Sequence, residues 1–397
     1  MGKIGVYGGS FNPIHLGHIQ AAEEMAQALN LDQVLIVPAS VPPHKQMPAY
    51  SPSAEERLEL VRLSLMDHPR LSACDLELRR SGPSYTVDTL TQLHAMRPED
   101  EIYLLMGTDM FLSLHSWYRA DEICRLARIV CAARETERPD KELEEQAKRL
   151  KKELHAKVTL VQNHPLEMSS TTVRRMIFFD CAQDYLAPQA LAYIEAHQLY
   201  GAKRDWTHLN LERLSFHSLA QHKPPRAKHA QGVCLTAQKL AERWGERIDL
   251  AARAGILHDV TKALDGPEQL KLCARYGLQL SPFEQTHPKL LHAKTGAAVA
   301  KHIFGECDKV CRAIYWHTTG HADMTLMEKI LYIADYAEPG RSFDGVERIR
   351  KNLYQDLDLA LYTGFCMSLE ELAREGKEVD VYSMEAAQFL KKERGFA

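Results

Sequence analysis

Apolar and polar residues alternate differently in the two halves of this 397-residue chain. Up to about residue 200, short apolar runs of strand type alternate with longer stretches whose apolar residues have helical spacing. Such alternation predicts an α/β fold, a parallel sheet covered by helices, with ligands at the carboxyl ends of the strands. The expected strands are 3–7, 33–38, 71–76, 101–106, 128–133 and 158–162, and the expected helices are 19–29, 54–66, 87–96, 120–126, 141–155 and 189–197.

The strand signal fades beyond the polar segment 202–207, and the later apolar segments have helical spacing. The second half is therefore predicted to be all-α. The chain is too long for one ordinary core, so we expect two domains, at 1–203 and 204–397. The helices expected in the second half are 209–220, 230–244, 250–258, 267–276, 295–304, 309–317, 324–336 and 357–374.

Composition narrows the class of protein. With 26% charged and 45% hydrophobic residues, the chain reads as a water-soluble globular protein. A net charge of −4 gives no general attraction to nucleic acid, and no apolar run of about 18 residues predicts a membrane span. We therefore expect neither nucleic acid nor membrane as a partner. Nine scattered cysteines without a CxxC pair, and no secretory signal at the start, indicate reduced thiols and a cytoplasmic location.

A glycine-rich turn follows the first expected strand. Residues 8–18 read GGSFNPIHLGH and lead directly into a helix. The unpaired N–H groups and the dipole of a helix N-terminus favour anions, and glycines let the backbone approach closely. His15 and His18 add side-chain donors. The turn therefore predicts a phosphate-binding loop.

Further segments fall where they could surround this loop. Lys45, in VPPHK, could neutralise a triphosphate, and SYTVD at 84–88 opens a helix whose backbone suits a flat polar ring. GTD at 107–109 ends a strand at the ligand face, and Trp117 could stack on a base. SSTTVR at 169–174 places hydroxyl groups and an arginine at a helix start, a second phosphate grip. A solvated Lys45 and a core Trp117 remain the plain alternatives.

In this order, GGSFNPIHLGH, VPPHK, SYTVDTL, GTD, Trp117 and SSTTVR resemble bacterial nicotinate mononucleotide adenylyltransferases over roughly residues 1–200. The resemblance implies a Rossmann-like nucleotidyltransferase domain that acts in NAD biosynthesis. It would join ATP to nicotinate mononucleotide, giving deamido-NAD and pyrophosphate, with Mg²⁺ entering with the ATP. Positioning and charge neutralisation would carry catalysis, without a protein nucleophile. Ser10 and Asn12 stand where that family usually has Thr and Asp.

The resemblance also assigns roles to residues. His15 and His18 would contact the ATP phosphates, and Lys45 and Arg174 would steady the leaving pyrophosphate; these four form the expected catalytic set. A related pantetheine-phosphate adenylyltransferase or cytidylyltransferase is the alternative, against which SYTVDTL and the tryptophan argue. The nicotinate nucleotide would be held by Thr86, Asp109 and Trp117, and the other expected substrate-binding residues are Gly8, Gly9, Ser10, Phe11, Ser170 and Thr171.

Histidines and aspartates gather on or beside the expected helices of the second half. Burying the adjacent pair His258–Asp259 in an apolar helix is costly unless a ligand compensates. Imidazole and carboxylate together suit iron, manganese or zinc, and Asp259 could bridge two ions. Such a two-metal centre would favour hydrolysis of a phosphate ester or anhydride. The candidate metal ligands are His229, His258, Asp259, His292, His317 and Asp335.

The local strings RAKH, HDVTK, LLH, HTTG and ADYAEPGR are similar to the HD phosphohydrolase superfamily, and within it to YqeK-type hydrolases, over roughly residues 205–390. This implies an all-α domain that cleaves diadenosine tetraphosphate into two ADP with two divalent metals, expected to be iron. Ala293 and Lys294 stand where that family usually has Gly-Pro. By this resemblance, one metal would be held by His229, His258, Asp259 and Asp335, and the other by Asp259, His292 and His317. His258 and Asp259 would also be catalytic. The substrate phosphates would be contacted by Lys262, Thr318 and Arg341.

The sequence thus predicts a bifunctional enzyme whose partners are small nucleotides: ATP, nicotinate mononucleotide and diadenosine tetraphosphate. Two alternatives for the second half stay open, a regulatory binding module and a hydrolase of another nucleotide such as a cyclic dinucleotide. All six ligand positions are occupied, which favours a hydrolase. A homo-oligomer is compatible with the sequence.

Overall fold

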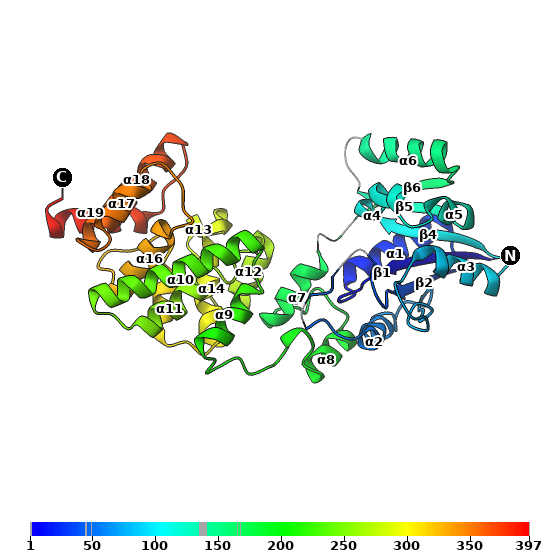
Figure 1. Ribbon diagram of the computed structural model, residues 1–397, viewed down its shortest axis with the longest axis horizontal. Helices are drawn as coiled ribbons and strands as arrows, with labels where there is room; N and C mark the ends of the chain where they lie inside the picture. The colour runs from blue at the N-terminus through cyan, green and yellow to red at the C-terminus, as the bar shows by residue number, and fades with distance from the viewer. Residues whose placement is uncertain are drawn as a thin grey trace. The chain divides into compact units, whose positions relative to one another are not determined.

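The computed structural model describes residues 2–43, 46–48, 50–134, 141–164, 166 and 168–396. The chain divides into two compact units, unit 1 from Met1 to Arg204 and unit 2 from Asp205 to Ala397 (Figure 1). Unit 1 is a parallel sheet with flanking helices, and unit 2 is helical, so both predicted fold classes are confirmed. Within the described ranges, no helix combines the length and apolar character needed to cross a lipid bilayer.

Within the described part of unit 1, six parallel strands form one sheet, in the order β3-β2-β1-β4-β5-β6. The chain builds outward from β1 to β3, then returns to the other side of β1 for β4. Loops from β1 and β4 therefore diverge at the carboxyl edge and leave room for a ligand. The strands are β1 (Lys3–Gly9), β2 (Gln33–Pro38), β3 (Leu71–Ala73), β4 (Glu101–Gly107), β5 (Arg128–Arg134) and β6 (Val158–Asn163).

The helices of unit 1 cover this sheet. The strands were predictable because parallel strands buried on both faces read as continuous apolar runs, as in β4, where Ile102 through Met106 are all buried. Only β3 is shorter than predicted, since pairing with β2 ends at Ala73. The helices are α1 (Leu16–Leu29), α2 (Ala54–Ser64), α3 (Thr86–Met96), α4 (Thr108–Ser113), α5 (Ala120–Leu126), α6 (Lys141–Leu154), α7 (Ser170–Phe178) and α8 (Pro188–Ala196).

Unit 2 is built from helices joined by short turns. Its α11 ends at Leu257, so His258 and Asp259 lie in the turn that follows rather than on the helix that we expected. The helices are α9 (Leu211–Leu219), α10 (Pro224–Trp244), α11 (Ile248–Leu257), α12 (Gly266–Arg275), α13 (Pro282–Thr286), α14 (Leu291–His302), α15 (Asp308–Trp316), α16 (Leu326–Ala337), α17 (Val346–Asn352), α18 (Leu357–Arg374) and α19 (Val381–Arg394).

Gly255 lets α11 pack directly against α10. A Cβ at this position would lie 2.7 Å from Cys234 Cα and 3.0 Å from the Cys234 backbone nitrogen. Backbone cannot move aside as a flexible side chain can, so only glycine allows this approach. The approach matters because His229 lies on α10 and His258 follows α11 directly. Close packing of the two helices thus brings the two histidines together.

Replacing Gly255 with alanine is expected to force α10 and α11 apart and to lower the free energy of unfolding of unit 2 by about 1–3 kcal/mol. Urea denaturation followed by the helical circular dichroism signal measures this loss. The control is Gly364→Ala in α18, where the nearest atom to a new Cβ lies at an ordinary 3.6 Å. Because alanine favours a helix more than glycine does, the control should leave the free energy of unfolding unchanged or raise it by up to about 1 kcal/mol. Equal losses in both variants would contradict the packing argument.

Candidate functional sites

A cavity of about 530 Å³ opens at the carboxyl ends of β1, β2 and β4 in unit 1. This volume lies within the range of about 300–1,000 Å³ typical of small-molecule sites. Ser84 and its neighbours at the start of α3 form one wall, and its Oγ accepts hydrogen bonds from the N–H groups of Ser40 and Val41 beyond β2. Of the residues predicted to form the site, those that line the cavity are Gly8, Gly9, Ser10, Thr86 and Trp117.

The two histidines of the glycine-rich turn stack on each other at the start of α1, with ring centroids 3.7 Å apart. The backbone N–H of His15 donates to Nδ1 of His18 at 3.3 Å, so the neutral His18 ring carries its proton on Nε2. Burial lowers the pKa of His15 to about 4. Among the described residues, its buried Nδ1 has no hydrogen-bond partner. The neutral His15 ring and the His18 ring therefore both offer hydrogen-bonding nitrogens at the predicted phosphate loop.

Arg174 holds the glycine-rich turn through a backbone carbonyl. Its Nη1 donates to the carbonyl of Asn12 at 2.6 Å, and Nη2 donates to the Thr171 hydroxyl at 3.1 Å. The hydroxyl of Ser170 donates to the carbonyl of Pro13 at 3.0 Å. The start of α7, expected as a second phosphate grip, is thus joined to the loop that carries the histidines.

Arg57 of α2 is a functional candidate that sequence reasoning missed. This side chain is 2% exposed, and its guanidinium donates to the carbonyls of Ser10 at 2.6 Å and Ala39 at 2.7 Å. It therefore ties the loop after β1 to the end of β2. An arginine in an amphipathic helix ordinarily reads as solvent-exposed, and no local signal in the sequence distinguishes this one.

Of the other predicted residues of unit 1, Phe11 and Asp109 do not line the cavity. Phe11 packs edge-on against His18, with ring centroids 5.2 Å apart, and Asp109 is exposed in the first turn of α4. Trp117 lines the cavity and donates from its indole nitrogen to the Ser113 hydroxyl at 3.2 Å. Lys45 falls outside the described residues.

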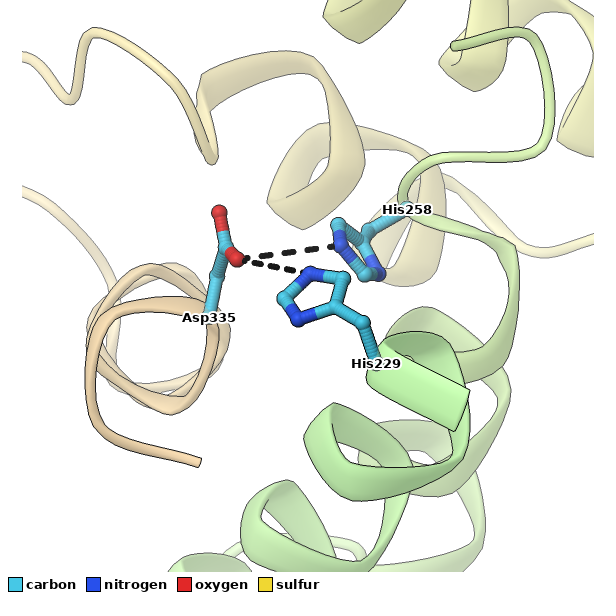
Figure 2. Close-up of side chains that lie close together, drawn as sticks. All are labelled: His229, His258 and Asp335. Carbon is cyan, nitrogen blue, oxygen red and sulfur yellow. Dashed lines mark ion pairs between the residues drawn. The ribbon is translucent and has the colours of Figure 1, made fainter. Parts of the chain in front are cut away.

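In unit 2, three predicted metal ligands from different segments converge on one point (Figure 2). Nε2 of His229 lies 3.0 Å, and Nε2 of His258 3.9 Å, from Oδ1 of Asp335, which α16 carries. The potential ligand atoms of these three residues all lie within 4.8 Å of one another, and His258, Asp259 and His317 form a second such group. His258 belongs to both groups.

Asp259 directs its two oxygens to different histidines. Oδ2 lies 3.4 Å from Nε2 of His258 and 3.8 Å from Nε2 of His229. Oδ1 lies 3.3 Å from Nε2 of His292 and 3.7 Å from Nε2 of His317. The carboxylate thus stands between two sets of imidazoles, as a bridging ligand of two cations would.

The histidine rings present Nε2 to the centre because their Nδ1 atoms are already engaged. Each of three Nδ1 atoms lies within 2.8 Å of a backbone carbonyl three residues earlier: His258 at Gly255, His292 at Lys289 and His317 at Ile314. A carbonyl oxygen only accepts hydrogen bonds, so each neutral ring carries its proton on Nδ1 and turns its Nε2 lone pair inward.

Glu338 plays the same part for His229. Its Oε1 lies 3.1 Å from Nδ1 of His229, and Oε2 accepts from the N–H of Gly340 at 2.6 Å. The carboxylate is buried, so its charge bears directly on this ring. A carboxylate behind a ligating histidine fixes its orientation and raises its basicity. Glu338 lies within the string ADYAEPGR, but its role in orienting His229 could be recognised only from its position beside that ring in the structure.

These residues fit a divalent metal. Although burial disfavours the charged form of Asp335, the neighbouring His229 holds the pKa of this carboxyl well below its usual range. An ionised carboxylate oxygen and an imidazole nitrogen thus lie 3.0 Å apart in a buried site. Among the described residues, the buried Nε2 atoms of His229 and His258 have no hydrogen-bond partner. A cation between these groups would satisfy them all, and the donor set of imidazole and carboxylate suits iron, manganese or zinc.

Cationic and hydroxyl side chains border the ligand cluster. Arg226 donates to Oδ2 of Asp259 at 2.9 Å, and the guanidinium of Arg341 pairs with the carboxylate of Asp335. The ammonium of Lys262 lies 3.1 Å, and the hydroxyl of Thr318 3.4 Å, from Nε2 of His292. The structure thus brings the three predicted phosphate contacts to the ligand cluster and adds Arg226. This rim suits an anionic substrate.

Comparison with known proteins separates the same two regions. Residues 6–176 match the family model described as cytidylyltransferase-like, and residues 226–340 match that of the HD domain. A probable nicotinate-nucleotide adenylyltransferase of Synechococcus sp. is 38% identical over 199 residues, covering 50% of this chain and 94% of that protein. A relative of the same name from Geobacillus thermodenitrificans is 38% identical over 209 residues, covering 51% of this chain and 88% of that protein.

Among solved structures, a predicted HD superfamily hydrolase involved in NAD metabolism from Clostridium acetobutylicum is 34% identical to this chain. The match covers 47% of this chain and 98% of that one, with a TM-score of 0.46.

The buried His15 predicts a specific acid sensitivity. Its pKa is about 4 in the folded protein against 6.5 ordinarily, so between these values the unfolded chain binds a proton that the folded chain does not. Stability should therefore fall as the pH drops from 6.5 to 4, by up to about 3 kcal/mol. Urea unfolding of the wild type and of His15→Gln at pH 7 and pH 4.5 measures the effect. The variant should lose less stability than the wild type, and identical losses would contradict this account.

Exchanging Glu338 for glutamine should weaken metal binding about 10- to 100-fold, because His229 loses the charge that raises its basicity. Equilibrium dialysis with Mn²⁺, followed by metal analysis, measures this change without an activity assay. The control is Glu328→Gln, a buried carboxylate of α16, the helix that Glu338 directly follows; Glu328 contacts Thr325 and Arg312 instead. Equal weakening in both variants would show that general destabilisation, rather than the contact with His229, is responsible.

Proposed function

Over its first half the chain belongs to the nicotinate-nucleotide adenylyltransferase family, and from this premise we propose that unit 1 transfers AMP from ATP to nicotinate mononucleotide. The observation that supports the proposal is the cavity where the glycine-rich turn, the start of α3 and Trp117 meet. The products would be deamido-NAD and pyrophosphate, which places unit 1 in NAD biosynthesis.

The proposed reaction needs no protein nucleophile. A phosphate oxygen of nicotinate mononucleotide forms a bond to the α-phosphorus of ATP, while the bond from that phosphorus to the bridging oxygen of pyrophosphate breaks. Backbone N–H groups of the glycine-rich turn and the Nε2–H of His18 would stabilise the phosphate charge. Thr86 and Trp117, which line the cavity, would position the nicotinate mononucleotide against the ATP. Mg²⁺ would enter with the ATP.

Arg174 and Arg57 would act by holding the loop in shape. Each donates to a loop carbonyl, at Asn12 and Ser10, and so fixes the direction of the neighbouring N–H groups. Arg174 would also supply positive charge for the leaving pyrophosphate. Lys45 is proposed to share this task on the resemblance alone.

For unit 2, the HD domain match and the ligand cluster support hydrolysis of a nucleotide, and we propose diadenosine tetraphosphate as substrate. The observation that carries this proposal is the division of Asp259 between two sets of imidazoles. Two divalent metals, with iron the expected ion, would polarise the phosphoryl group and lower the pKa of water. Attack of water oxygen on one central phosphorus would break its bond to the bridging oxygen and yield two ADP.

The protein residues of unit 2 would orient this substrate. His229, His258, Asp259 and Asp335 would hold one metal, and His292 and His317 would share Asp259 for the other. Lys262, Thr318 and Arg341 would contact the phosphates from the rim of the centre, joined by Arg226. The rim would thereby neutralise charge on the polyphosphate.

Paired substitutions test whether the two activities are separate. His258→Ala should lower hydrolysis of diadenosine tetraphosphate at least 100-fold and release the bound metal, yet leave adenylyl transfer within about twofold of the wild type. His18→Ala should lower adenylyl transfer about 100-fold and spare hydrolysis and metal content. Both reactions are followed by nucleotide chromatography on protein purified without oxygen, with the metal content measured in parallel.

Each half of this proposal can fail alone. Hydrolysis retained by His258→Ala without bound metal would refute the metal centre as the active site. Wild-type protein that retains metal but cleaves a cyclic dinucleotide instead of diadenosine tetraphosphate would replace the proposed substrate. A wild-type chain that forms no deamido-NAD from ATP and nicotinate mononucleotide would refute the assignment of unit 1.

A further inference from the structure

A second cavity, of about 860 Å³, lies in unit 2, and Arg341 in its lining pairs with the candidate metal ligand Asp335. Its wall follows the chain from Tyr336, directly after the ligand Asp335, through Arg341 to Gly345. Residues of α18, among them Met367, form the other wall. The volume falls in the range of about 300–1,000 Å³ of small-molecule sites, and the ligand cluster itself does not account for it.

Arg341 connects this cavity to the metal centre. Its Nε donates to the carbonyl of Asp335 at 2.9 Å, its Nη2 pairs with the carboxylate of the same residue, and the side chain also lines the cavity. A phosphate that reaches the ligand cluster therefore meets Arg341. Whatever group that phosphate carries is then directed along the cavity.

The wall between the two sites is held in place before any ligand binds. Arg350 of α17 donates to the carbonyls of Ala337 at 3.1 Å, Glu338 at 2.7 Å and Arg341 at 2.9 Å. These three bonds fix the loop that follows α16. A preformed wall loses little conformational entropy when a ligand binds, which favours affinity.

The interior combines aromatic rings with carboxylates. The rings of Tyr336 and Phe343 meet edge to face, with centroids 5.8 Å apart, and the Met367 side chain lies beside Gly345. Aromatic faces of this kind stack on nucleobases. Three carboxylates and three guanidinium groups share the lining, so their charges balance. The charged lining residues are Asp344, Glu370, Glu371, Arg341, Arg348 and Arg374.

The mixed charges of the lining favour some parts of a nucleotide over others. The carboxylates would repel a bare polyphosphate chain, but they can accept hydrogen bonds from ribose hydroxyls or from the amino group of a base. Arg341, beside Asp335, is the cation placed for phosphate. The uncharged nucleoside thus suits the interior, and the charged phosphates suit the end at the metal ligands.

We propose that this cavity binds the nucleoside portion of a nucleotide whose phosphates extend to the metal centre, with Phe343 and Tyr336 as the surface on which the base stacks. The inference rests on the proposed hydrolase function of unit 2 and adds to it a subsite that recognises the base.

Photoaffinity labelling tests the subsite on the full-length, metal-loaded chain. After irradiation with 2-azidoadenosine diphosphate, labelled peptides are located by mass spectrometry, which separates this cavity from the nucleotide site of unit 1. We expect label within residues 336–374, about tenfold weaker in Phe343→Ala. The matched control is Phe216→Ala, an exposed phenylalanine of α9, which should label as the wild type does. Label confined to residues 1–204, or equal labelling of Phe343→Ala and the wild type, would overturn the proposal.

Steady-state kinetics separates failure of the subsite from failure of the hydrolase assignment. Phe343→Ala, and Phe343→Leu, which removes the ring but retains apolar volume, should raise KM for diadenosine tetraphosphate about tenfold, with the loss carried by KM rather than kcat. Turnover with unchanged KM in both variants would refute the subsite. Absence of turnover in the wild type, together with label that still depends on Phe343, would refute the proposed substrate and leave the subsite standing.

Discussion

The close approach of Asp335 and His229 is the constraint around which unit 2 is arranged. Oδ1 of Asp335 and Nε2 of His229 lie 3.0 Å apart in a buried site, and helices from distant parts of the chain hold them there. Backbone carbonyls and Glu338 engage the Nδ1 atoms of the histidine rings, so the rings are held with Nε2 toward the carboxylates. The fold therefore gathers a set of nitrogen and oxygen ligands that a divalent cation would complete.

In unit 1, the proposed role of the glycine-rich turn is to present backbone N–H groups to an anion. Its loop has little regular structure of its own between β1 and α1, so its form depends on neighbours. Arg57 of α2 and Arg174 of α7 lie far apart in the sequence and bind carbonyls two residues apart, at Ser10 and Asn12. Carbonyl groups held in this way direct the intervening N–H groups, and binding and shape thus depend on side chains outside the motif.

The sequence predicted the strands, most helices and the grouping of ligands, because those features depend on local periodicity or on residue types that are rare in apolar surroundings. It placed His258 and Asp259 on a helix, because they directly follow the apolar run that ends at Leu257, whereas α11 ends there and the two residues lie in the next turn. It did not predict α19, whose face retains exposed apolar residues such as Val381 and Tyr382 and so lacks a clear pattern. The role of Arg57 depends on carbonyls that only the tertiary fold brings near this side chain, so no local sequence pattern predicts the role.

The carbonyl contacts of the glycine-rich turn bear on which substitutions this turn can accept. A carbonyl is the same whichever residue supplies it, so Arg57 and Arg174 hold the loop without regard to the side chains at positions 10 and 12. Serine and asparagine there, in place of the threonine and aspartate more usual for this kind of loop, leave those two contacts intact. Substitutions at positions 10 and 12 would therefore leave these two contacts in place, whereas loss of either arginine, far from the motif in the chain, would remove one of them.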